Sequence, residues 1–106
     1  MKVAIYVRTN ENHEKMTTKT AAQLFRLYTY AIEKGYEVSL KHIYTDTGSA
    51  NFKHRPGFEK LVSSARAEGI SKLLVTGLDR LYRNAYAAGE VDLLLQRLDI
   101  SVEVVG

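Results

Sequence analysis

The chain has 106 residues, of which 45% are hydrophobic and 25% charged, the composition of one ordinary folded domain. It contains no cysteine, which excludes disulfide frameworks and thiolate metal sites and makes a reducing cytoplasm the expected compartment. The formal net charge of +3 is compatible with a polyanionic partner without identifying one, and no signal peptide or membrane span is expected.

The first half of the chain predicts a strand, a helix and a second strand. Lys2–Arg8 is rich in β-branched and aromatic residues and predicts a buried strand, and the polar segment Thr9–Thr18 predicts a loop. The helix is predicted to have Thr20 as its N-cap and Gly35 at its C-terminal end. Its apolar stripe is expected to face the core and comprises Leu24, Leu27, Tyr28, Ala31 and Ile32. Glu37–Tyr44 alternates apolar and polar residues, which predicts a strand.

The second half continues the alternation of helices and strands. Arg55-Pro56-Gly57 is expected to open a helix that ends at Gly69, because proline suits the first helical turn. The other predicted elements are a loop at Thr45–His54, a strand at Ile70–Thr76, a connection at Gly77–Arg83, a helix at Ala85–Leu98 and a strand at Ile100–Val105. This order predicts a single α/β domain with three layers, in which helices cover both faces of a mostly parallel sheet of four to five strands.

Arginines and aspartates follow the predicted strands. In an open parallel sheet, ligands bind beyond the carboxyl ends of the strands, so residues far apart in sequence should meet there. The residues concerned are Arg8, Thr9, Asn10, Asp46, Ser49, Arg55, Asp79, Arg80 and Arg83. Arginine suits planar recognition of phosphate, and the cluster could stabilise charge on an attacked phosphodiester. The alternative is that each arginine is a surface residue and that Asp46 or Asp79 is an incidental ion-pair partner.

Taken in order, these residues resemble the serine recombinase (resolvase/invertase) family. The similar segments are Tyr6-Val7-Arg8, Gln23, Tyr44-Thr45-Asp46-Thr47-Gly48-Ser49, Arg55-Pro56-Gly57-Phe58 and Leu78-Asp79-Arg80-Leu81-Tyr82-Arg83. The resemblance implies a three-layer resolvase-like domain that recombines DNA at specific sites. In that reaction a serine oxygen attacks the phosphodiester and leaves a 5′-phosphoserine and a free 3′-hydroxyl, and the reaction reverses after subunits exchange.

The resemblance also implies roles for residues. The catalytic positions are Arg8, Asn10, Arg55, Asp79, Arg80 and Arg83, and the positions that border DNA or its phosphate are Tyr6, Gln23, Asp46 and Ser49. No metal or cofactor is implied. The implied partners are DNA and further copies of the chain, as a dimer or as a tetramer during exchange. The chain is expected to lack the long oligomerisation helix and the separate DNA-binding domain that follow in family members.

Asn10 departs from the family pattern, which has a nucleophilic serine at that position. A carboxamide nitrogen is not a nucleophile, so the chain should bind the phosphate without cleaving it. Three explanations stay open: a naturally inactive relative, an introduced change, or a substitute hydroxyl from Thr9 through a shifted loop. A non-catalytic relative that binds DNA or modulates an active recombinase is the second hypothesis.

Two further expectations concern the rest of the sequence. An unrelated phosphate-binding or receiver-like domain is disfavoured, because neither a glycine-rich loop nor an acidic cluster follows the first strand. His13, His42 and His54 have no metal-ligand spacing, and we expect them to be exposed to solvent.

Overall fold

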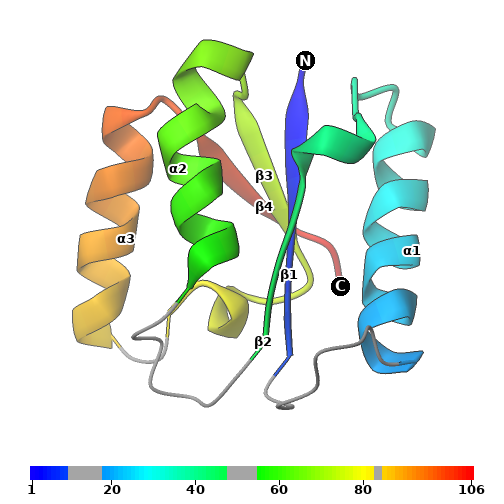
Figure 1. Ribbon diagram of the computed structural model, residues 1–106, viewed down its shortest axis with the longest axis horizontal. Helices are drawn as coiled ribbons and strands as arrows, with labels where there is room; N and C mark the ends of the chain where they lie inside the picture. Colours follow the sequence, from blue (N-terminus) through cyan, green and yellow to red (C-terminus); the bar gives the residue numbers. More distant parts are fainter. Residues whose placement is uncertain (10–17, 48–54, 83–84) are drawn as a thin grey trace.

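The computed structural model of the chain describes residues 1–9, 18–47, 55–82 and 85–106. Within these residues one parallel sheet has the strand order β2-β1-β3-β4. The strands are β1 (Val3–Thr9), β2 (Ile43–Thr47), β3 (Lys72–Val75) and β4 (Ser101–Val104). The helices are α1 (Thr18–Glu33), α2 (Pro56–Glu68) and α3 (Ala85–Arg97). Figure 1 shows α1 on one face of the sheet and α2 and α3 on the other, which confirms the predicted three-layer α/β fold.

Strand β1 lies at the centre of the sheet, and all its residues are buried. Successive side chains of a strand point to opposite faces, so β1 contributes to both apolar cores. Ala4 and Tyr6 pack on the α2 and α3 face, whereas Val3, Ile5 and Val7 pack on the α1 face. The same alternation decides which face the residues at the end of the strand occupy.

The second strand begins later than the sequence predicts. The predicted strand Glu37–Tyr44 is wrong: Leu40–His42 form a short 3₁₀ helix, and the strand is Ile43–Thr47. Glu37 makes one isolated parallel bridge to Lys2. The apolar and polar alternation that indicated a strand reflects a turn, in which Leu40 is 78% exposed and His42 is 2% exposed. Asp46, predicted to lie in a loop, is therefore part of β2.

Helix α1 buries a narrower stripe than predicted and begins at Thr18 instead of after Thr20. Leu27 and Ala31 are buried, as expected, but Tyr28 and Ile32 are exposed. Tyr28 contributes to an apolar groove between α1 and the 3₁₀ helix Leu40–His42, so it does not reach the core beneath β1.

Within the described parts of the chain, no helix is both long and apolar enough to cross a membrane.

His42 is buried, so the expectation that it is exposed is wrong. The turn that precedes β2 directs its ring toward α2, where its Nε2 lies 3.2 Å from a carboxylate oxygen of Glu68. Lys41 contacts the same oxygen at 3.3 Å. The bond to His42, followed by that to Lys41, lowers the pKa of Glu68. His13 and His54 lie outside the described residues.

Glu103 of β4 joins the sheet edge to α1. Its carboxylate accepts hydrogen bonds from Lys72 Nζ at 2.8 Å, from the Tyr36 hydroxyl at 2.9 Å and from the Tyr30 hydroxyl. These donors, with Lys72 first, lower the pKa of Glu103 from 4.5 to about 2. Charge-assisted bonds of this kind, partly shielded from water, are the stronger class of hydrogen bond.

We expect Glu103→Gln to lower Tm at neutral pH, on the order of 5 °C for the loss of about one charged hydrogen bond. Folding lowers the pKa of Glu103, so the stabilisation that the Glu103 carboxylate gives the folded state is fully present above pH 4.5. It is lost as the pH falls through about 2. Thermal unfolding followed by circular dichroism should therefore show a smaller fall of Tm over this pH window in Glu103→Gln than in the unmodified chain. Glu90→Gln, an exposed change on α3, is the control. Equal pH profiles for Glu103→Gln and the unmodified chain would contradict this role.

Candidate functional site

Three arginines from separate segments meet where the carboxyl ends of the strands lie. Arg8 is the penultimate residue of β1, Arg55 is the N-cap residue of α2, and Arg80 ends the 3₁₀ helix Leu78–Arg80 after β3. Burial lowers the pKa of Arg8 most, and the charges of Arg55 and Arg80 lower it further. Arg55 also lies over the ring of Tyr6 of β1, and the 3₁₀ helix that ends at Arg80 contacts β1. We call these three residues the arginine cluster.

Asp46 lies beside the arginine cluster and is almost completely buried. Its Oδ1 accepts a hydrogen bond from the Gly57 backbone N–H at 2.7 Å. Its Oδ2 accepts one from the Phe58 N–H at 3.0 Å and one from the Tyr6 hydroxyl at 2.7 Å. A carboxylate against the first N–H groups of a helix is stabilised by the helix dipole. Asp46 therefore ties β1, β2 and the start of α2 together.

Tyr6 and Phe58 form an aromatic surface beneath Arg55. The two rings pack edge to face with centroids 5.6 Å apart. The guanidinium carbon of Arg55 lies 4.2 Å from the Phe58 centroid and 5.7 Å from that of Tyr6, within cation–π range. Burial, followed by the hydrogen bond to Asp46, raises the pKa of the Tyr6 hydroxyl. Tyr6 is fully buried, so it supports the site from below.

The Arg55-Pro56-Gly57-Phe58 segment has a packing reason for each residue after the arginine. Pro56 occupies the first turn of α2, where its missing N–H costs no hydrogen bond. A Cβ on Gly57 would lie 2.3 Å from the Thr45 carbonyl oxygen, so only glycine lets α2 approach β2 this closely. Phe58 is buried against Tyr6. The segment therefore aims Arg55 at the carboxyl ends of the strands.

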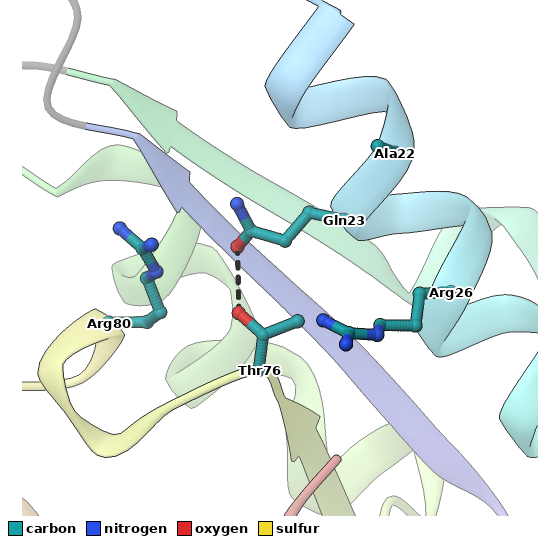
Figure 2. A pocket seen from close by; sticks show the side chains of 5 residues that line it. All are labelled: Ala22, Gln23, Arg26, Thr76 and Arg80. Carbon is teal, nitrogen blue, oxygen red and sulfur yellow. Dashed lines mark hydrogen bonds between the residues drawn. The ribbon is translucent and has the colours of Figure 1, made fainter. Parts of the chain in front are cut away.

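A polar pocket of about 530 Å³ lies between α1 and the end of β3. The described residues that line it are Ala22, Gln23, Arg26, Thr76 and Arg80. Figure 2 shows the Thr76 hydroxyl bonded to the Gln23 side-chain oxygen, a contact of 3.2 Å, with Arg26 and Arg80 on either side. The connections from β1 and β3 lead to opposite faces of the sheet, and this switch point is where open α/β sheets bind ligands. Gln23 and Arg80 were predicted from the sequence, whereas Arg26 and Thr76 were not. The spacing of Gln23 and Arg26, about one helical turn apart, is the signal that could have indicated Arg26.

The other predicted site residues are Asn10, Ser49, Asp79 and Arg83. Asn10, Ser49 and Arg83 lie outside the described residues. Asp79 is exposed in the same 3₁₀ helix as Arg80. The structure thus brings Arg8, Arg55 and Arg80 together with Tyr6 and Asp46, and it places Gln23 on the α1 side.

The comparison with known families agrees with this geometry. The sequence profile described as "Resolvase, N terminal domain" matches residues 3–106. The chain belongs to the resolvase family of serine recombinases. The likeness that the sequence motifs indicated is therefore confirmed at the level of the family. No curated protein gives a significant sequence match to this resolvase domain.

Solved structures similar to the resolvase domain include catalytic domains of a serine recombinase and of an integrase. The C-terminal catalytic domain of ISC1926 TnpA, an IS607-like serine recombinase, is 26% identical with a TM-score of 0.83, over 100% of this chain and 70% of that one. The N-terminal catalytic domain of TP901-1 integrase is 28% identical with a TM-score of 0.77, over 98% and 76%. A resolvase family site-specific recombinase from Streptococcus pneumoniae, at 24% identity, shares the fold with a TM-score of 0.81, over 99% and 72%.

We expect Asp46→Asn to destabilise the resolvase domain by about 2–3 kcal/mol. The charged carboxylate accepts two buried hydrogen bonds and one partly buried one, and the substitution replaces one of its two acceptor oxygens with an NH₂ donor. Urea denaturation measures this loss as a lower midpoint at unchanged slope. Asp92→Asn, at an exposed position of α3, is the matched control and should leave the midpoint unchanged. If the two variants unfold at the same urea concentration, Asp46 does not have the structural role assigned to it.

Proposed function

We propose that residues 1–106 form one catalytic-type domain of a site-specific DNA recombination system, and that the arginine cluster holds a DNA phosphodiester. The observation that supports this function is the convergence of Arg8, Arg55 and Arg80 from three separate segments. Guanidinium groups remain charged at physiological pH and match phosphate oxygens in shape. Held in place by packing, they can stabilise the charge of an attacked phosphodiester without a metal or nucleotide cofactor.

The proposed role excludes formation of the phosphoserine link by this chain. The carboxamide of Asn10 can donate hydrogen bonds to a phosphate, but its nitrogen lone pair is delocalised and does not attack phosphorus. Thr9 carries the adjacent hydroxyl. It follows Val7 by two residues in β1, so its side chain lies on the same face of the strand as Val7, which packs on the α1 face. Arg8 follows Tyr6 by two residues, so its side chain lies with that of Tyr6 on the opposite face. The Thr9 side chain therefore lies on the opposite face of β1 from Arg8, which weakens the case for a substitute nucleophile.

A domain that binds a DNA phosphodiester without cleaving it can still contribute to recombination. Recombinases of this family are expected to act as assemblies of several subunits on DNA. We propose that the chain contributes DNA binding to such an assembly, either with its own copies or beside an active subunit. The retained arginine cluster, together with Asn10, favours this non-catalytic form of the function.

The decisive test is formation of a covalent protein–DNA adduct. The domain is fused to the C-terminal parts of a related recombinase whose crossover site is known, incubated with nicked suicide DNA, denatured and run on a gel. We expect no covalent band from the Asn10 protein and a band from Asn10→Ser. Asn10→Ser combined with Arg8→Gln should lose that band, because the phosphate is no longer held.

Each contrary result has a defined meaning. A covalent band from the unmodified protein would show that the chain has a nucleophile and would overturn the non-catalytic role. Absence of a band from Asn10→Ser, on DNA that the related recombinase itself cleaves, would show that the arginine cluster is not a competent cleavage site.

A further inference from the structure

The pocket beside α1 has the composition of an anion site. Arg26 from α1 and Arg80 from the 3₁₀ helix approach it from two sides, and among its described lining residues none is acidic. The Thr76 hydroxyl donates to the Gln23 side-chain oxygen, and no bond from the Gln23 amide nitrogen is formed with the described part of the chain, so its two N–H groups can donate to a ligand. The Nε of Arg80 is buried with no hydrogen-bond partner among the described residues. The pocket therefore presents donors and positive charge.

This pocket lies on the other face of the sheet from Arg8 and Arg55. Leu74 packs in the core under α1, and Thr76, two residues later, continues on that face. Arg8 follows the alternation of Tyr6, which packs toward α2. Strand β1 thus separates the two places. Arg80 belongs to both, because it lines the pocket and its charge also lowers the pKa of Arg8.

We propose that the pocket binds a second sugar–phosphate unit of the DNA strand, next to the unit held by Arg8 and Arg55. Its volume of about 530 Å³ exceeds what a phosphate alone needs and leaves room for the attached sugar. Arg26 supplies charge to the phosphate, and the Gln23 amide N–H groups meet phosphate or sugar oxygens. Arg80 lies between the two units and contacts both. This inference rests on the proposed function, since it takes DNA to be the ligand.

The test counts phosphate contacts from the salt dependence of DNA binding. Fluorescence anisotropy measures the affinity for a short fluorescein-labelled DNA duplex over a series of KCl concentrations. Each neutralised phosphate contributes about 0.9 to the slope of log affinity against log salt. We expect Arg26→Gln to reduce the slope by about one such contact. Arg97→Gln removes the same charge from an exposed site in the last turn of α3, at the opposite edge of the sheet, and should match the unmodified domain (Figure 1).

Two additional variants separate the two phosphate sites. Arg8→Gln should reduce the slope independently, so the losses in the Arg8→Gln, Arg26→Gln double variant should add. Gln23→Glu places a carboxylate between Arg26 and Arg80 and should weaken binding at least as much as Arg26→Gln. Loss at Arg8 without loss at Arg26 would overturn the pocket as a DNA site and leave the proposed function standing. Losses that do not add would mean one shared phosphate and would also overturn the second site. If neither variant changes the slope, both proposals fail.

Discussion

The buried carboxylate of Asp46 is the interaction on which the arrangement of the site depends. A charge removed from water is stable only when its oxygens are satisfied, and here hydrogen bonds from two backbone N–H groups and one hydroxyl meet that need. These donors belong to the start of α2 and to β1, so the carboxylate sets the distance between a helix end and the sheet. The direction of Arg55 follows from it, because Arg55 immediately precedes α2 and lies over Tyr6 and Phe58.

In the proposed function, the groups that hold the phosphate are separate from the position of the nucleophile. Arg8, Arg55 and Arg80 are positioned by a strand, by a helix start and by a 3₁₀ turn, and none of these elements needs a serine at position 10. The proposed non-catalytic role, with asparagine at position 10, is therefore compatible with the arrangement of these three arginines. The pocket beside α1 extends this part across β1, so the domain presents positive charge on both sides of its central strand.

The element order and the convergence of the arginines were predictable, because parallel strands place their carboxyl ends at one edge. The features that depend on contacts between residues distant in sequence were not predictable. The alternation before Ile43 is the same in a strand and in a turn that buries His42, so β2 was placed too early. Nothing near Asp46 in sequence indicates that its donors lie in α2 and β1. Arg26 and Thr76 became site residues only through the way α1 lies over the end of β3.

The central place of β1 also has a consequence for how the chain folds. Within this domain β1 is synthesised before the other strands; it pairs with β2 on one side and with β3 on the other, and β4 pairs only with β3. The backbone edge of β1 that faces β3 therefore stays unpaired until a segment about seventy residues later has been synthesised. Contacts this distant in sequence form slowly, and unpaired strands aggregate readily in the meantime. The parallel order that gathers the arginines at one edge thus makes the nascent chain dependent on protection until β3 is available.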